Sequence, residues 1–120
     1  MLSFSSRHRY YIFSEPTDMR KSFDGLSGIV RHHGKHPLLS GDVFIFLNRR
    51  CNRIKLLMWD VTGFALYYKR LERGTFEKPL FIDDKKTIEL NWSDLVMLLE
   101  GIEQKSVKRR KRYSRKMGVF

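Results

Sequence analysis

The basic side chains of this sequence are the groups with the clearest chemical use. Seven of them lie between residues 49 and 73, where only Asp60 and Glu72 oppose them. These seven are Arg49, Arg50, Arg53, Lys55, Lys69, Arg70 and Arg73. A one-sided cluster of this kind attracts polyphosphates, because phosphate oxygens pair with cationic groups whatever the base sequence. The cluster therefore predicts a surface that contacts nucleic acid.

Four aromatic residues are interleaved with these cations. They are Trp59, Phe64, Tyr67 and Tyr68. Aromatic rings beside arginine and lysine can stack on nucleic-acid bases. Alternatively, the segment folds as strands whose aromatic side chains fill a core while the cations face water. The sequence leaves both interpretations open.

The excess of positive charge lies mostly at the C-terminal end. The chain carries 24 Lys and Arg against 13 Asp and Glu, a formal net charge of +11. Residues 1–104 hold 16 basic and 13 acidic side chains, whereas residues 105–120 hold eight basic side chains and no acidic one. Such a block stays solvated and often serves as an arm for nucleic acid, although a simple solubility tail is the plainer alternative.

We therefore predict a single domain over residues 1–104 and a basic, flexible tail over residues 105–120. The nucleic-acid-binding residues that the sequence predicts are Arg20, Lys21, Arg49, Arg50, Arg53, Lys55, Lys69, Arg70, Lys108, Arg109, Arg110, Lys111 and Arg112.

The acidic residues offer a weaker alternative, a metal-dependent nuclease. Two-metal phosphoryl transfer needs carboxylates that converge on a pair of cations about 4 Å apart. Asp83 and Asp84 are the only adjacent acidic pair, and with Glu103 and Lys105 they make a loose nuclease-like pattern. Patterns as loose as this arise by chance. Glu103 is moreover expected at a helix end and not on a core strand.

Histidine and cysteine form no recognisable metal or nucleophile motif. His32, His33 and His36 point in different directions if they end a helix, and positively polarised side chains suit a helix C-terminus. Cys51 is the single cysteine and lies in a polar segment. No glycine-rich phosphate-binding loop is present. We therefore predict a binding protein with no enzymatic activity, no metal and no cofactor.

Length and composition limit the class of protein further. With 120 residues, 42% of them hydrophobic, the chain can bury the core of one domain. The longest apolar runs, Val43–Leu47 and Leu95–Leu99, have five residues each, whereas a membrane-spanning helix needs about 20. Residues 1–7 lack the charged and then apolar pattern of a secretory signal. We expect a cytoplasmic protein that does not associate with membranes.

Hydrophobic periodicity predicts the elements that position these groups. Apolar runs bounded by turn residues predict strands over 8–13, 43–47, 53–59, 64–71 and 87–91. Helical spacing predicts one helix from a cap at Thr17 or Asp18 to Gly34, and a second over 94–102 capped by Ser93. The three middle strands have connections too short for parallel crossovers, so they form an antiparallel meander. The predicted fold is α+β, an antiparallel sheet of four or five strands with two helices.

Several blocks of the sequence, in order, resemble one protein family. The blocks are Thr17–Leu26 (TDMRKSFDGL), Gly41–Phe46, Asn48–Arg50, Ile54–Leu57, Trp59–Asp60, Gly63–Phe64, Tyr68–Phe76 and Leu98–Ile102. They are similar to the small accessory protein, often called TnpB, that is encoded by the second reading frame of the sixty-six class of bacterial insertion sequences. The resemblance covers about residues 8–103. An additional leucine in Leu38–Ser40, and Cys51 in place of an expected cation, depart from the family pattern.

The resemblance implies a protein of a mobile element that acts beside a separate transposase, which carries the acidic catalytic triad. It implies no catalytic residue here, and it carries over basic motifs at Arg20-Lys21, Asn48–Arg50 and Tyr68–Arg70. We therefore hypothesise a non-catalytic accessory protein of transposition that binds DNA through a basic sheet face and the tail. The alternatives are an adaptor that binds the transposase without contacting DNA and, less favoured, the metal-dependent nuclease.

Overall fold

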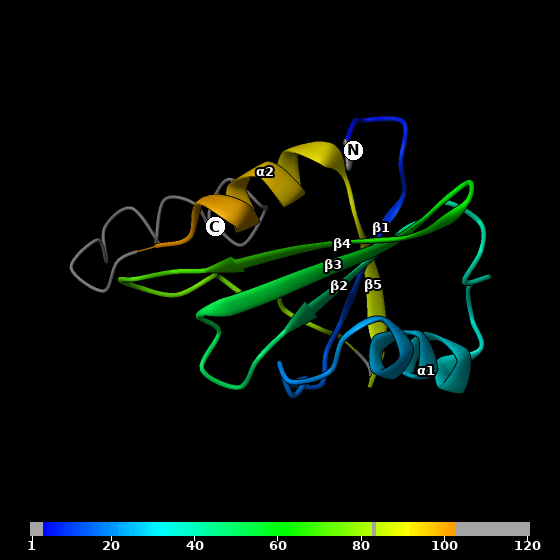
Figure 1. Cartoon of the computed structure of the whole chain (residues 1–120). Helices are drawn as coiled ribbons and strands as arrows, with labels where there is room; N and C mark the ends of the chain where they lie inside the picture. The colour runs from blue at the N-terminus through cyan, green and yellow to red at the C-terminus, as the bar shows by residue number, and fades with distance from the viewer. Residues whose placement is uncertain (1–3, 83, 103–120) are drawn as a thin grey trace.

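Five strands form one sheet in the computed structural model, which describes residues 4–82 and 84–102 (Figure 1). The strands are β1 (Tyr10–Phe13), β2 (Val43–Leu47), β3 (Arg53–Asp60), β4 (Gly63–Arg70) and β5 (Thr87–Leu90), and they lie in the order β4-β3-β2-β1-β5. The helices are α1 (Phe23–His33) and α2 (Trp92–Glu100). The predicted α+β class, with four or five strands and two helices, is confirmed.

The meander predicted from the short connections is present, but the sheet also contains one parallel pair. β3 pairs antiparallel with β2 and with β4, so that Leu56 lies between Ile45 and Tyr67. β1 runs parallel to β2, with Tyr10 level with Val43, and antiparallel to β5. Parallel neighbours need a long crossover connection, and residues 14–42 provide one that contains α1. The sheet is therefore mixed, where the sequence predicted an antiparallel one.

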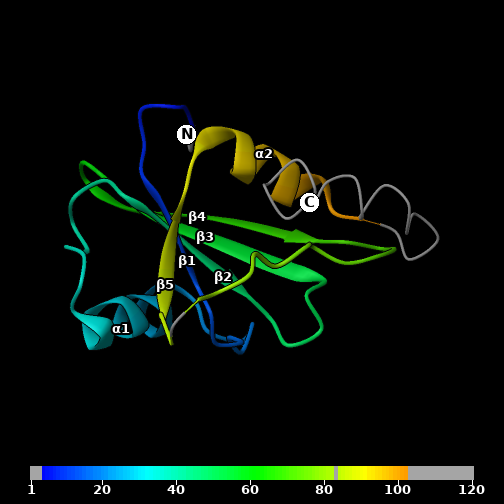
Figure 2. The same ribbon diagram turned by 180° about the vertical axis from the view of Figure 1, so that it is seen from behind.

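The two helices cover opposite faces of the sheet (Figures 1 and 2). Successive side chains of a strand point to opposite faces, so each central strand contributes to two cores. Ile45 packs in the cluster under α2 with Leu95, whereas Phe46 packs in the cluster over α1 with Leu26. All five residues of β2 are buried. This two-sided burial explains why Val43–Leu47 is a continuous apolar run.

Helix α1 begins later than its sequence predicted. Its first residue is Phe23, and the Asp18 carboxylate accepts a hydrogen bond from the Arg20 backbone N–H at 2.9 Å instead of capping a helix. Residues 16–20 thereby form an ordered segment between β1 and the helix. The end of α1 agrees with expectation, because Gly34 adopts a left-handed conformation with φ of 66°.

Helix α2 begins earlier than predicted, with Asn91 as its cap in place of Ser93. The Asn91 side-chain oxygen accepts from the Asp94 backbone N–H at 2.8 Å, and the Asp94 carboxylate accepts from the Asn91 backbone N–H. This reciprocal pair satisfies two N–H groups that the helix itself leaves without partners. Within residues 4–82 and 84–102, neither helix combines the length and the apolar character that a membrane crossing requires.

Candidate nucleic-acid interface

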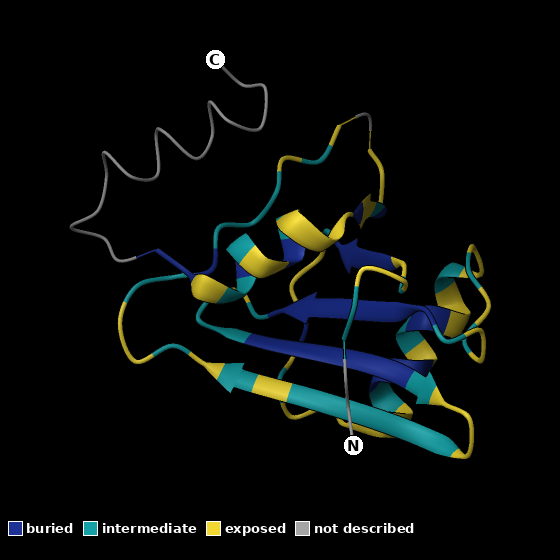
Figure 3. Ribbon diagram, turned by 90° about the horizontal axis from the view of Figure 1, so that it is seen from above, coloured by how far each residue is buried: buried dark blue, intermediate teal, exposed yellow. Residues whose placement is uncertain are grey.

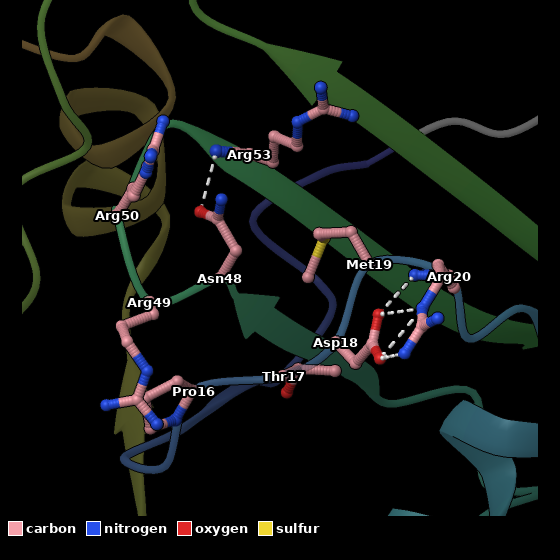
Figure 4. Close-up of a pocket in the computed structure, with 9 residues that line it drawn as sticks. All are labelled: Pro16, Thr17, Asp18, Met19, Arg20, Asn48, Arg49, Arg50 and Arg53. Carbon is pink, nitrogen blue, oxygen red and sulfur yellow. Dashed lines mark hydrogen bonds and ion pairs between the residues drawn. The ribbon is translucent and has the colours of Figure 1, made fainter.

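Four arginines line a groove beside the ends of β1 and β2 (Figure 4). They are Arg20, Arg49, Arg50 and Arg53. One wall is the segment 16–20, which follows β1, and the other is the turn 48–52, which joins β2 to β3. The Thr17 backbone N–H donates to the Leu47 carbonyl oxygen at 2.8 Å, which holds the walls together. The groove has a volume of about 610 Å³.

Asn48 fixes the shape of the turn that carries Arg49 and Arg50 and leads into Arg53, the first residue of β3. Its side-chain oxygen accepts from the backbone N–H groups of Asn52 at 3.0 Å and Arg53 at 2.9 Å. Its amide group donates to the Asn52 side-chain oxygen at 2.7 Å. Cys51 adopts a φ of 56° within this turn, a conformation that costs a non-glycine residue energy. This role of Asn48 was not predicted from the sequence, although an asparagine at the start of a turn is its signal.

Asn48→Ala is expected to lower the free energy of unfolding by about 1–3 kcal/mol, because two backbone N–H groups lose their acceptor. Chemical denaturation monitored by circular dichroism measures the change. Ser40→Ala is the control and should cost less, because it removes an exposed hydrogen bond to the Pro37 carbonyl oxygen and the acceptor of only one backbone N–H, that of Asp42 at 3.2 Å. An unchanged stability in Asn48→Ala would contradict the bracing role of this side chain.

The guanidinium groups of the turn remain available to a ligand. Arg49 and Arg50 are exposed, and within the described residues neither has a hydrogen-bond or ion-pair partner. Arg53 donates to the Tyr68 hydroxyl oxygen at 2.7 Å, a neutral partner that leaves its charge uncompensated. Three positive charges are therefore carried by this turn and the first residue of β3, on side chains that extend in different directions (Figure 4).

Arg20, on the opposite wall, is already paired. Its guanidinium donates to both carboxylate oxygens of Asp18, with the shortest contact at 2.6 Å. The hydrogen bonds from Arg20 lower the pKa of Asp18 to about 2, and the same carboxylate raises the pKa of Arg20. The predicted binding role of Arg20 is thereby weakened, because the pair has no net charge.

Acid should break this pair only at very low pH. A depressed carboxylate pKa gives a stabilising contribution that is present above the unfolded value of 3.8 and lost as pH falls towards 2. NMR titration of the Asp18 carboxyl carbon should therefore give a midpoint near 2. In Arg20→Ala the midpoint should return towards 3.8. A wild-type midpoint near 3.8 would show that the two side chains do not pair in solution.

Lys55 is not the surface cation that the sequence predicted. It is buried, with 5% of its surface exposed, and its ammonium donates to the carbonyl oxygens of Met19 at 2.8 Å and Lys21 at 2.7 Å. It also lies 4.6 Å from the centre of the Tyr68 ring. The long side chain thus ties the segment before α1 to the sheet. Lys55 is a structural residue that supports the groove, because its donors are used internally.

The other predicted cations of the sheet do not share one face. Lys69 lies on the α2 side, where its ammonium donates to the Leu99 carbonyl oxygen at 2.7 Å. Arg70 lies opposite Arg53 in the ladder but pairs with Glu72 at 2.9 Å. Lys21 is exposed beside α1. The basic sheet face predicted from the sequence is therefore replaced by a smaller group, Arg49, Arg50 and Arg53, which we call the arginine turn.

The aromatic residues of the meander belong mainly to the core. Phe64 and Tyr67 pack against opposite core clusters, and Trp59 makes an edge-to-face contact with Phe64 at 5.1 Å between ring centres. Tyr68 is the exception, with 46% of its surface exposed beside Arg53. It is the one aromatic ring of the four that is well exposed next to the arginine turn.

The residues of the nuclease alternative are mostly outside the described part of the chain. Asp83 and Glu103 lie outside it, and Asp84 is exposed. In the part that the structure describes, no three His, Cys, Asp or Glu side chains gather as a metal site would require. The histidines have other contacts: His36 stacks on Tyr11 with ring centres 3.7 Å apart.

The five predicted binding residues of the tail also fall outside the described residues, and so does the tail itself. They are Lys108, Arg109, Arg110, Lys111 and Arg112. The candidate interface within the described residues is therefore the groove with its arginine turn.

Comparison with known proteins gives the family of the chain. Residues 8–109 match the model of the IS66 Orf2 like protein family. The chain therefore belongs to this family, whose members are products of IS66-type insertion sequences, as the resemblance implied.

Two relatives come from Sinorhizobium fredii strain NBRC 101917 / NGR234. The uncharacterized protein y4jC is 29% identical over 102 residues, which are 85% of this chain and 86% of the relative. The uncharacterized protein y4hO is 33% identical over 103 residues, which are 86% of this chain and 88% of the relative. No solved structure matches the chain.

Proposed function

We propose that this insertion-sequence protein is a non-catalytic accessory factor that binds DNA through the arginine turn, with the basic tail adding affinity. One observation carries the proposal. Among residues 4–82 and 84–102, Arg49 and Arg50 are exposed without side-chain partners, and Arg53 beside them has only a neutral one. Elsewhere in the meander the cations are already engaged by carbonyl or carboxylate oxygens. Arginine is the cation best suited to phosphate, because its planar group binds two oxygens at once.

The shape of the site favours a backbone contact over base reading. The groove lies beside a braced turn from which Arg49, Arg50 and Arg53 extend in different directions, an arrangement that suits separate phosphates along a backbone (Figure 4). Tyr68, beside Arg53, adds an exposed ring that can stack on a base. Contacts to phosphates position a nucleic acid but carry little sequence information. We therefore expect similar affinity for the terminal repeats of the element and for a scrambled duplex.

Fluorescence anisotropy with labelled duplex DNA at several salt concentrations tests this function. Each neutralised phosphate contributes a slope of about −0.9 to the plot of log affinity against log salt. The three contacts of the arginine turn alone predict a slope of about −2.7, and contacts from the tail should make the slope more negative. A scrambled competitor should displace the terminal repeat. Absence of binding at low salt, or affinity that does not change with salt, would overturn the proposal.

A second candidate function is the adaptor that contacts the transposase of the same element. It is favoured by the outer side of α2, where Trp92 and Val96, one helical turn apart, are both more than one third exposed. Co-purification of the transposase with this chain should then depend on Trp92 and Val96 and not on the arginine turn. Unchanged co-purification after Trp92→Ser with Val96→Ser would exclude this surface.

A further inference from the structure

Strand β4 is an open edge of the sheet. It pairs with β3 on one side only, and among the residues that the structure describes no strand pairs with its other side. In Figure 3, β4 runs along the outer margin of the sheet with α2 set back from it. At eight residues it equals β3 in length and is twice as long as β5, the strand at the opposite edge.

The hydrogen-bond pattern shows which backbone groups of β4 face outward. The Leu71 backbone N–H donates to the Asn52 carbonyl oxygen at 2.8 Å, so these two residues form a hydrogen-bonded pair. Such pairs alternate along an antiparallel ladder, and alternate residues of β4 therefore turn both backbone groups away from β3. The outward-facing residues are Phe64, Leu66, Tyr68 and Arg70.

This edge lacks the features that normally prevent strands from pairing between molecules. Natural edge strands are protected by central charges, prolines, bulges or short length. From Gly63 to Tyr68 the strand contains no charged residue and no proline, and its register with β3 has no bulge. Charges appear only at its end, at Lys69 and Arg70. The edge can therefore accept another strand.

We propose that β4 pairs with β4 of a second copy of this chain, antiparallel, to form a continuous ten-stranded sheet. The charges select the direction, and the matching of the outward residues with their own copies in one register selects the occupant. Parallel pairing would place Lys69 and Arg70 beside their own copies, whereas antiparallel pairing places them at the uncharged start of the other strand. One register matches all four outward residues, with Phe64 opposite Arg70 and Leu66 opposite Tyr68. Tyr67 then meets Tyr67 of the second copy on the two-fold axis.

The pairing has a consequence for the arginine turn. Two-fold edge pairing keeps equivalent faces of the two sheets on the same side, because directly opposed residues share a face. The two α1 faces, and with them Arg53 and Arg70 of both copies, then lie on one side of the joined sheet. Pairing of the two β4 edges does not depend on the proposed function, because it involves backbone groups of the edge and not the ligand.

Analytical ultracentrifugation of the full chain tests the association first. A dimer has twice the chain mass of 14.4 kDa, and we expect it to dominate at concentrations near 100 μM. A chain that remains monomeric throughout this range overturns the proposal.

Ala65 provides a matched pair of variants for the register. In the proposed register it lies opposite Lys69 of the second copy, and symmetry makes two such contacts. Ala65→Lys should raise the dimer dissociation constant roughly three- to thirtyfold, and Ala65→Glu should lower it by a similar factor. Circular dichroism checks that both variants fold. Shifts of the same sign, or none, would overturn the register even if the chain is dimeric.

Disulfide formation gives a second measurement that needs no change of charge. Tyr67→Cys in a Cys51→Ser background places two thiols at a non-hydrogen-bonded pair, with Cα atoms about 4.5 Å apart, within disulfide range. Oxidation should then give a covalent dimer on a non-reducing gel. Ala65→Cys in the same background is the control. Residue 65 of one copy lies opposite residue 69 of the other in the proposed register, so the two introduced thiols are four positions apart. Equal cross-linking of both variants, or none in Tyr67→Cys, would overturn the arrangement.

Discussion

Replacing Arg49, Arg50 and Arg53 together by alanine is expected to lower the affinity for duplex DNA by two to three orders of magnitude at about 0.1 M salt. This size assumes that each arginine neutralises one phosphate. Each such contact contributes about 0.9 to the salt slope, so three contacts are worth about 2.7 logarithmic units of affinity at 0.1 M salt. The slope itself should become shallower by about 2.7. Anisotropy titrations of both proteins over a range of salt concentrations measure the two changes.

A control with the same loss of charge separates the arginine turn from general attraction. Arg31, Lys35 and Lys85 are exposed, lie away from the groove and have no ion-pair partner within the described residues. Their triple alanine variant also lowers the net charge by three. We expect it to weaken binding less than tenfold, since distant charges are screened. Equal losses in the two triple variants would mean that net charge, and not the turn, determines binding.

Lys55→Ala is expected to lower the free energy of unfolding by about 2–4 kcal/mol, the second large effect. The substitution removes two charge-assisted hydrogen bonds, to Met19 and Lys21, and the packing of the aliphatic stem. The segment before α1 should loosen, because these two bonds attach it to the sheet. Urea denaturation measures the loss, and hydrogen exchange of residues 16–22 locates it.

Lys55→Met is the matched variant for this prediction. It keeps the stem and removes the ammonium, so its loss of stability should be smaller than that of Lys55→Ala. With the fold retained at low temperature, its DNA affinity should fall much less than that of the arginine-turn variant. A stable Lys55→Ala protein with strongly reduced DNA affinity would instead show that Lys55 contacts phosphate directly.

Much of the architecture could be predicted from local pattern. The continuous apolar run of β2 and the alternation of β3 follow from burial on one or both faces of a sheet, and the short turns after them allow only antiparallel neighbours. The parallel pairing of β1 with β2 was not predicted. A strand sequence specifies which faces are buried, but it does not specify which neighbour will lie beside it.

The candidate site was predicted in part for a related reason. The positions of Arg49, Arg50 and Arg53 on one basic segment are visible in the sequence. Whether their guanidinium groups are free to bind a ligand is not visible in the sequence, because it depends on which oxygen atoms lie nearby after folding. Lys55 resembles them in the sequence, yet the chain brings two carbonyl oxygens from 34 and 36 residues away to its ammonium.

The sequence alone determined the sign and amount of the charge, the two-sided central strand, the helical segments and, through several ordered motifs, the insertion-sequence family. These properties depend on residue type and on contacts between near neighbours. Tertiary structure alone decided which cations remain free, which aromatic rings are buried and which edge of the sheet stays open. Each of those outcomes depends on groups that are distant in the chain and meet only when the sheet and both helices have assembled.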